Sequence, residues 1–284
     1  MKKLLFVFLL TLSSVSYSAE VIKVVFPFVG MPEHQRHLFE KANAIQNKWN
    51  FVLATKAGAG GGIAAIDVLQ NHSSILIGNS SFFIRPNLPN SPYQVDQFKL
   101  LSVGCASPMV VASSKYKSLN DIKGSLNVGI SGIGSLSHVV ASTLTQKYPE
   151  LVSVPYKGMG ETLQGVFTGE IDMTMQYVKS VEEYIKVGKM NALGITGNKS
   201  YLNIPTLSNQ GFKNTNLLTN NFILLVPKNT PKELYDEWRQ LFSKIDNQER
   251  YNNEMCTPIN ETADWFMEQQ VFWKNVISTM KVTE

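Results

Sequence analysis

The chain alternates short apolar segments with segments of helical periodicity, and this alternation limits its fold more than any other feature. Apolar runs rich in β-branched residues occupy 21–26, 49–55, 74–78, 126–130, 152–154, 171–175 and 192–196, and helical patterns follow several of them. Repeated strand–turn–helix units are typical of α/β proteins with largely parallel sheets. We therefore predict an α/β fold whose ligands bind at the turns after the strands.

Later segments extend this pattern. A long apolar run over 100–113 is broken by Pro108, and a further strand over 221–227 leads into Thr230-Pro231-Lys232-Glu233. Thr at the N-cap, Pro at the first position and Glu at the third predict a helix start. In a last helix, six apolar residues lie on one side and are expected in the core: Trp265, Phe272, Trp273, Val276, Ile277 and Met280.

The first residues have the pattern of a secretory signal peptide. Lys2 and Lys3 precede the apolar run 4–12, and small residues follow up to Ala19. A basic start, a short apolar stretch and a small-residue cleavage zone predict export, with residues 1–18 removed after Ser18. No cysteine lies near that zone, so we expect a soluble periplasmic protein without a lipid anchor.

Charge and cysteine content restrict the partners. Loss of Lys2 and Lys3 from 26 basic residues leaves 24 against 22 acidic ones, a net charge of +2, and no basic cluster is present. Nucleic-acid-binding surfaces normally show such clusters, so we expect no nucleic-acid partner. In an exported protein the two cysteines, Cys105 and Cys256, can pair, but the sequence leaves open whether they do.

A glycine-rich turn over 56–66 links the strand at 49–55 to a helix. A turn before a helix exposes backbone N–H groups at the positive end of the helix dipole and is suited to an anion. The run Gly58-Ala59-Gly60-Gly61-Gly62-Ile63 matches neither the dinucleotide fingerprint nor the P-loop. We expect no cofactor.

Two other groups of residues are candidates for a catalytic or a metal site. Ser131 or Ser135 with His138 would suit a secreted serine hydrolase, although the full nucleophile motif is incomplete. Glu33, His34 and His37 share one helix, but two histidines without further ligands make a weak zinc signature. We expect an exposed pair between Glu33 and His37, no metal site and no catalysis.

In combination, several motifs resemble the Bug family, the periplasmic solute-binding proteins of tripartite tricarboxylate transporters. They are Pro27-Phe28, Gly58-Ala59-Gly60-Gly61, Gly78-Asn79-Ser80-Ser81, Gly132-Ile133-Gly134-Ser135 with His138, Val154-Pro155-Tyr156-Lys157-Gly158, Thr168-Gly169-Glu170-Ile171-Asp172-Met173, Gly188-Lys189-Met190, Ala192-Leu193-Gly194-Ile195-Thr196 and Ile204-Pro205-Thr206. The resemblance covers nearly the whole mature sequence.

The resemblance implies a two-lobe periplasmic binding fold of type II with a ligand cleft between the lobes. We expect a monomer, because such a cleft must open and close. The first lobe would comprise 19–107 plus 226–284 and the second 108–225, with hinge strands near Pro108 and Leu225. It also implies that backbone groups of the loop after the first strand hold a small carboxylate. The candidate ligand-binding residues are Phe28, Val29, Gly30, Met31, Gly60, Ser80, Ser81, Gly134, Ser135, His138, Tyr156, Lys157, Gly158, Gln176 and Tyr177.

That loop departs from the family pattern. The family loop is rich in Pro and Gly and ends in an Asp, whereas residues 28–35 read Phe-Val-Gly-Met-Pro-Glu-His-Gln. Met31 and Glu33 change its shape and charge, which points to a ligand that is cationic in part, such as an amino acid. The resemblance implies capture of a di- or tricarboxylate, an aromatic acid or an amino acid for membrane transporter subunits. A sensor that presents its closed form to a membrane kinase is the alternative.

Overall fold

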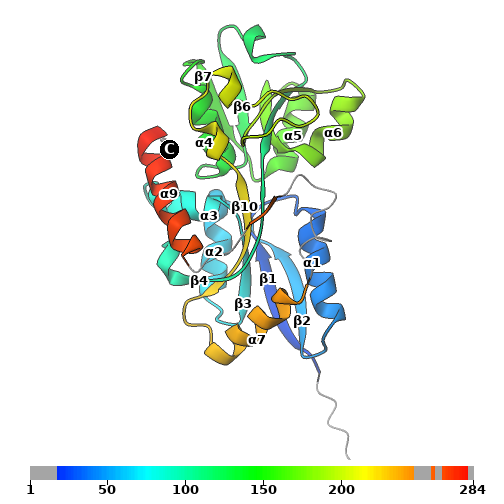
Figure 1. The fold of residues 1–284 in the computed structure, drawn as a ribbon, viewed down its shortest axis with the longest axis vertical. Coiled ribbons are helices and arrows are strands. Elements are labelled where there is room, and N and C mark those ends of the chain that lie inside the picture. The colour runs from blue at the N-terminus through cyan, green and yellow to red at the C-terminus, as the bar shows by residue number, and fades with distance from the viewer. Residues whose placement is uncertain (1–17, 246–256, 260–263, 281–284) are drawn as a thin grey trace, which may run out of the picture.

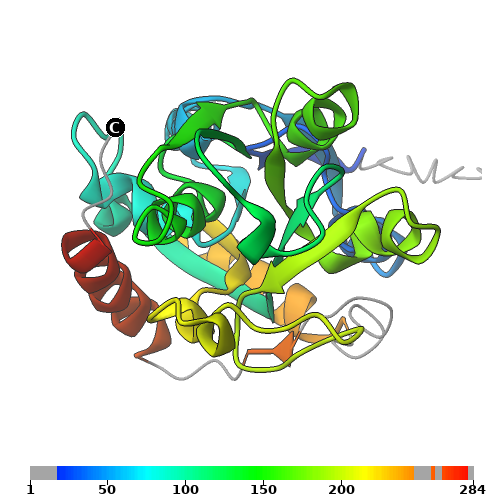
Figure 2. The ribbon, with the colours of Figure 1, turned by 90° about the horizontal axis from the view of Figure 1, so that it is seen from above.

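The protein consists of two lobes, each built around one β-sheet, with strands passing between them (Figures 1 and 2). This computed structural model describes residues 18–245, 257–259 and 264–280. The expected signal peptide, apart from Ser18, lies outside that range. The periodicity of the sequence placed most strands and helices within one or two residues of their observed bounds.

The first lobe contains a six-stranded sheet with the order β11-β4-β10-β3-β1-β2. Its strands are β1 (Glu20–Phe26), β2 (Trp49–Thr55), β3 (Ser74–Gly78), β4 (Phe98–Ser107), β10 (Asn220–Pro227) and β11 (Thr257–Pro258). Strand β1 pairs in parallel with β2 and β3. Strand β10 runs antiparallel to β3 and β4, and β11 is antiparallel to β4.

The second lobe contains a five-stranded sheet with the order β7-β6-β8-β5-β9. Its strands are β5 (Met109–Ser113), β6 (Leu126–Ile130), β7 (Leu151–Pro155), β8 (Met173–Tyr177) and β9 (Asn191–Ile195). Strand β6 pairs in parallel with β7 and β8, whereas β5 is antiparallel to β8 and β9.

The prediction of largely parallel sheets is therefore wrong: both sheets are mixed. The antiparallel pairs come mainly from β5 and β10, which flank the passages between the lobes and run against their neighbours. Pro108 separates β4 in one sheet from β5 in the other. Leu225, where we expected the second passage, pairs with Leu76 and Leu100 inside the six-stranded sheet. The passage precedes Asn220.

Helices pack on both sheets. They are α1 (Glu33–Ala44), α2 (Gly62–Leu69), α3 (Ser81–Ile84), α4 (Leu136–Leu144), α5 (Met159–Thr168), α6 (Val178–Lys186), α7 (Lys232–Ser243) and α9 (Trp265–Met280). Helix α7 corrects one detail of the prediction. Its N-cap is Pro231, without a side-chain cap, while the Thr230 hydroxyl donates to the His72 carbonyl.

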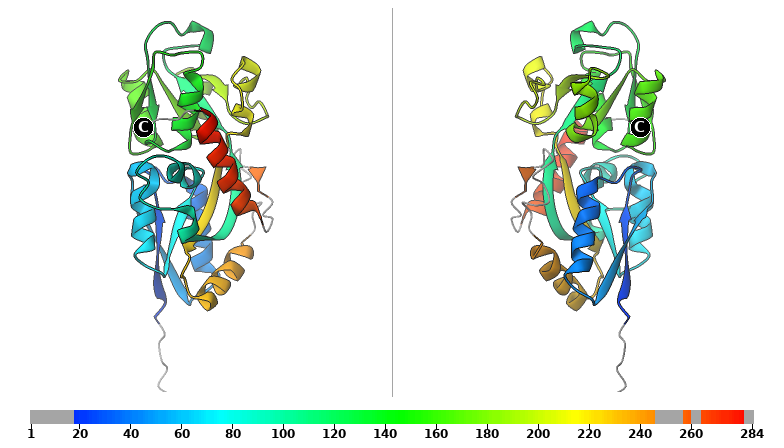
Figure 3. Two further views of the ribbon diagram at one scale, coloured as in Figure 1. Left: turned by 90° about the vertical axis from the view of Figure 1, so that its left-hand side faces the viewer. Right: turned by 90° about the vertical axis from the view of Figure 1, so that its right-hand side faces the viewer.

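Helix α9 lies along both lobes (Figures 1 and 3). It packs against α3 of the first lobe and α4 of the second. Trp265 and Trp273 are buried in an apolar cluster that includes Phe83 from the first lobe and Val140 from the second. The two lobes thus share one continuous apolar core beside the strands that connect them.

Cys105 lies fully buried on β4 and is disulfide-bonded. Cys256, the other cysteine of the sequence, lies outside the described residues. Within the part of the chain that the structure describes, no helix is both long and apolar enough to cross a membrane.

Candidate ligand-binding cleft

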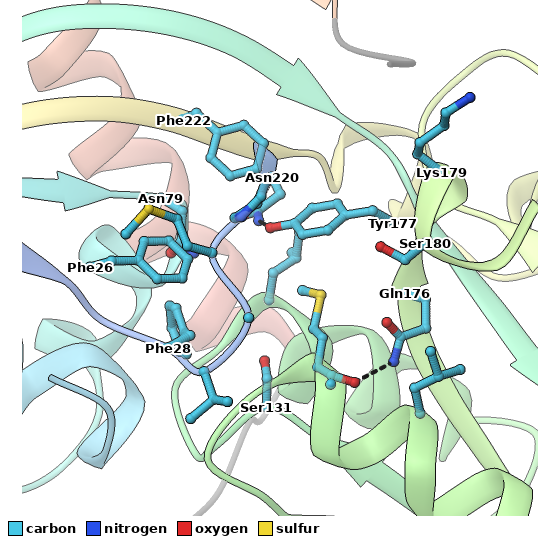
Figure 4. Close-up of a pocket in the computed structure, with 18 of the residues that line it drawn as sticks. Phe26, Phe28, Asn79, Ser131, Gln176, Tyr177, Lys179, Ser180, Asn220 and Phe222 are labelled. Atoms are coloured by element: carbon cyan, nitrogen blue, oxygen red, sulfur yellow. Dashed lines mark hydrogen bonds between the residues drawn. The ribbon is translucent and has the colours of Figure 1, made fainter. Parts of the chain in front are cut away.

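A cavity of about 350 Å³ lies between the lobes, at the carboxyl ends of β1, β3 and β8 (Figure 4). Its volume falls within the usual range for small-molecule pockets. Its wall is largely apolar and aromatic. The lining residues are Phe26, Phe28, Val29, Gly30, Met31, Pro32, Glu33, Asn79, Ser81, Ser131, Leu136, Met159, Gly160, Leu163, Gln176, Tyr177, Lys179, Ser180, Asn220 and Phe222.

Three helices begin at this cavity. Pro32 and Glu33 start α1, Met159 and Gly160 start α5, and Tyr177 precedes α6. The first N–H groups of a helix have no partner within it, and none of these three helices has a side-chain cap. The cavity therefore faces three sets of partly positive N–H groups, which favour a negative charge.

Few charged side chains line the cavity. Among the described lining residues these are Glu33 and Lys179. Lys179 is ion-paired with Glu182 at 3.3 Å, and its amine points away from the cavity (Figure 4). The main positive potential inside the cavity therefore comes from backbone N–H groups rather than from a side chain.

A hydrogen bond joins the two lobes beside the cavity. The Asn220 amide at the start of β10 donates to the hydroxyl of Tyr177 at the end of β8, and its oxygen accepts from the Ser80 N–H at 3.3 Å. The Tyr177 ring packs on Phe222 with centroids 5.6 Å apart. The aromatic wall is therefore assembled from both lobes.

Two backbone approaches, which we call the closure contacts, bring the lobes together at the cleft. In the first, a Cβ on Gly60 would lie 2.1 Å from the Ile133 carbonyl oxygen. In the second, a Cβ on Gly158 would lie 2.4 Å from the Val29 carbonyl oxygen, and the Val29 N–H donates to the Lys157 carbonyl at 3.3 Å. Only glycine leaves room for such approaches.

The glycine turn thus meets the second lobe instead of lining the main cavity. With the loop after β6 it borders a neighbouring cavity of about 410 Å³, where Gly60, Tyr156 and Lys157 lie. The hydroxyl of Tyr156 is buried beside Gly165, inside the second lobe. Burial, together with the nearby carboxylate of Glu170, raises the pKa of Tyr156 to about 12.

The structure places the predicted ligand-binding residues in three groups. The main cavity is lined by Phe28, Val29, Gly30, Met31, Ser81, Gln176 and Tyr177. The neighbouring cavity contains Gly60, Tyr156 and Lys157, and also Phe28. The lining of these two cavities does not include Ser80, Gly134, Ser135, His138 or Gly158.

The five residues of this last group contact other parts of the protein and line neither cavity. The Ser80 hydroxyl donates to the Thr219 carbonyl and accepts from the Asn221 N–H. Ser135 is the N-cap of α4 and accepts from the His138 N–H at 3.3 Å. A Cβ on Gly134 would lie 2.7 Å from the Arg85 side chain across the cleft. Polar turn residues at strand ends can be caps as well as ligand contacts.

Several lining residues were missed by sequence reasoning. Asn79 belongs to the motif Gly78-Asn79-Ser80-Ser81 and Gly160 to the first turn of α5, so their position soon after a strand was a usable signal. Asn220 and Phe222 lie on β10, which comes from a distant part of the sequence, and no local pattern linked them to the other strands.

The residues considered for a serine hydrolase or a metal site have the following neighbours in the structure. The hydroxyls of Ser131 and Ser135 both contact the Ser137 hydroxyl, at 3.0 and 2.8 Å, and His138 Nδ1 accepts from the Gly134 N–H. In the described residues no group of three or more His, Cys, Asp or Glu could hold a metal. His37 pairs with Glu40 at 3.5 Å, not with Glu33 as expected.

Comparison with known proteins identifies the family. The profile of the Tripartite tricarboxylate transporter family receptor matches residues 41–280. The chain belongs to this receptor family. A UPF0065 protein from Pseudomonas sp. (strain P51) is 26% identical over 54% of the chain and 51% of its own length. Protein BugT from Bordetella pertussis is 23% identical over 89% of the chain and 85% of its own length.

The chain thus spans about half the length of the first of these relatives. Several solved structures have the same two-lobe fold. The periplasmic binding protein BugD superposes with a TM-score of 0.82 at 21% identity, covering 93% of this chain and 98% of its own. An R. palustris protein with adipate superposes with a TM-score of 0.80 at 18% identity, covering 93% of this chain and 98% of its own. MatC from Rhodopseudomonas palustris, with bound malate, superposes with a TM-score of 0.78 at 19% identity, covering 91% of this chain and 99% of its own.

Proposed function

We propose that this receptor captures a small carboxylate in the cleft between its lobes and delivers it to membrane transporter subunits, without catalysis. The observation that carries the proposal is the group of three uncapped helix N-termini, those of α1, α5 and α6, around one apolar cavity. Such a site fits a molecule with one concentrated negative charge and an apolar body.

The expected binding energy is sufficient without a cationic side chain. Buried hydrogen bonds to a charged group contribute about 1.5–3 kcal/mol each. A helix N-terminus adds about 0.3–2 kcal/mol. A few such contacts reach the ~8 kcal/mol of micromolar binding. Adipate and malate are the ligands named for two proteins of the same fold, which supports a carboxylate here.

Closure is the proposed mechanism of capture. The two lobes meet at the closure contacts, and ligand bridging the cleft stabilises that arrangement over an open one. We place the division of the chain at Pro108 and just before Asn220, where the strands pass between the sheets. We further propose that residues 1–18 direct export to the periplasm and that the protein acts as a monomer.

Thermal-shift and calorimetric titration with a panel of small acids tests the carboxylate site. The panel contains malate, succinate, adipate, benzoate and amino acids, each with its amide, which lacks the carboxylate charge, as a control. A true ligand at 100 times its Kd stabilises the fold by ~2.7 kcal/mol. We expect at least one acid, and no amide, to raise Tm. Equal responses to acid and amide would contradict the proposal.

Delivery to a transporter needs a separate test. We expect cells that lack this receptor to lose uptake of the radiolabelled acid identified by titration, and a plasmid copy to restore it. Normal uptake together with loss of a transcriptional response to that acid would favour the sensor alternative.

A further inference from the structure

We infer that the cleft selects a monocarboxylate that also carries a hydrogen-bond donor, a hydroxyl or an ammonium, and that Gln176 reads this donor. The inference rests on the proposed carboxylate site and narrows its ligand class. It follows from the orientation of one buried amide, from the charges that face the cavity and from the aromatic wall.

Gln176 lies at the end of β8 with 1% of its surface exposed. Its Nε2 donates to the Met159 carbonyl at 2.9 Å and also contacts the hydroxyls of Thr162 and Thr174. A backbone carbonyl can only accept a hydrogen bond, so this contact fixes which end of the amide is nitrogen.

The oxygen of Gln176 consequently faces the cavity, as Figure 4 shows. Among the described residues none donates a hydrogen bond to this Oε1. An acceptor at the wall of a cavity loses its hydration when a ligand fills that cavity, and a donor on the ligand would restore the missing bond. A carboxylate at the same place would set two acceptors against each other.

The charges around the cavity also disfavour a second carboxylate. Glu33 is negative, and the Lys179 amine is directed to Glu182 and away from the cavity. Lys157 lies at the neighbouring cavity. The three helix N-termini can hold one carboxylate, but the described lining offers no unpaired cation for another.

The wall between these polar groups suits an apolar ligand body. Phe26 and Phe28 are buried and pack edge to face with centroids 6.1 Å apart, and Phe222 packs on Tyr177. Aromatic walls favour flat or aliphatic carbon surfaces over additional charged groups.

Matched probes test this inference by calorimetry. One set is hexanoate, its ω-hydroxy and ω-amino derivatives, and adipate. The butyrate and benzoate series supply the same four end groups on other bodies. In the best-fitting series we expect the hydroxy or amino acid to bind at least tenfold more tightly than the plain acid, and the diacid to bind more weakly than either. The relative Kd of hydroxy and amino acids distinguishes the two donors.

Two substitutions of Gln176 serve as matched variants. Gln176→Met keeps the size of the side chain and removes the acceptor, so the ratio of Kd between plain and donor-bearing acids should fall to about one. Gln176→Glu keeps an acceptor and should retain or increase the preference for a donor. The ratio of Kd is measured within each variant, so a loss of stability does not affect it. If a variant does not fold, the ratio measured for the wild type decides the test.

The outcomes separate this inference from the proposed function. Tightest binding of the diacid in all three series would overturn the inference and leave a carboxylate receptor. An unchanged ratio in Gln176→Met would also overturn it. Absence of binding by every acid in the three series would overturn both.

Discussion

Gly60 and Gly158 occupy positions where the backbone of one lobe meets the backbone of the other. The sequence suggested that these glycines hold an anion, but the structure gives them closure contacts with Ile133 and Val29. Small size is needed at these points for the closed arrangement and not for folding of either lobe. Substitution should therefore affect binding more than stability.

Gly60→Ala tests this distinction. We expect the substitution to weaken ligand affinity by more than tenfold and to shift small-angle X-ray scattering toward an open form, because the added Cβ would contact the Ile133 carbonyl. Gly188→Ala is the matched control, since Gly188 also has a positive φ but no atom within 4 Å of the added Cβ. Both should lose about 1–2 kcal/mol through backbone strain. Equal affinities would show that the contact is not required.

Tyr156 leads to a prediction about alkaline pH. Its raised pKa of about 12 means that ionisation favours the unfolded chain, where tyrosine titrates near pH 10. The corresponding stability is present below pH 10 and is lost as pH rises toward 12. Urea unfolding should show a smaller loss over this range in Tyr156→Phe than in the wild type. Parallel curves would contradict the assignment.

The same Tyr156→Phe variant should keep wild-type ligand affinity at neutral pH. The hydroxyl is buried beside Gly165 and does not reach the main cavity. A tenfold loss of affinity would mean that the hydroxyl turns toward the ligand in the bound state.

At the level of elements, the helix starts at the cavity differ from the start of α4. Ser135 caps α4 with its hydroxyl, whereas the N-cap of α5 is Gly158, which has no side chain to cap it. An uncapped start leaves N–H groups for a bound anion, and a capped one supplies its own acceptor. The start of α5 can therefore accept a bound anion, whereas the start of α4 already has an acceptor.

Gly160→Asp tests the start of α5. A Cβ at Gly160 has no atom within 4 Å, so the carboxylate can be accommodated at the cavity. Asp in the first turn should stabilise the helix by about 0.3–1 kcal/mol. It should also weaken binding of the acid by at least a hundredfold, because two negative charges ~4 Å apart repel by about 4 kcal/mol near a protein surface. Gly160→Asn, similar in size and neutral, is the control.

A variant that is more stable than the wild type and binds the acid poorly would support the anion site. Equal affinities of the Asp and Asn variants would contradict it. Chemical unfolding and calorimetric titration of the two variants provide both quantities.

Local sequence patterns were sufficient for some of these features and not for others. The strand β1 was predicted from its apolar run, whereas the loop residues Phe28 to Met31 were expected from the resemblance to the Bug family and line the main cavity. The positions of the Ser135 and Tyr156 side chains could not be predicted in this way, because a turn residue can face its own helix or the cleft. The contribution of Asn220 depends on a contact with Tyr177, 43 positions away.

At the scale of the whole molecule, α9 packs against both lobes. Trp273→Ala should destabilise the protein by about 3–5 kcal/mol, since this side chain is 1% exposed in the shared core. Met267→Ala on the same helix is the control, because Met267 is 59% exposed. Differential scanning calorimetry should give one transition for the wild type and both variants. Two resolved transitions would show that the lobes unfold independently.

The shared core has a consequence for the order of folding. Helix α9 follows every strand of the described residues in sequence, so the sheets of both lobes are synthesised before the helix that packs on them. Until residues 265–280 leave the ribosome, the apolar surfaces of α3 and α4 that later contact this helix stay uncovered. The nascent chain is therefore expected to remain a substrate for chaperones until these residues have been synthesised.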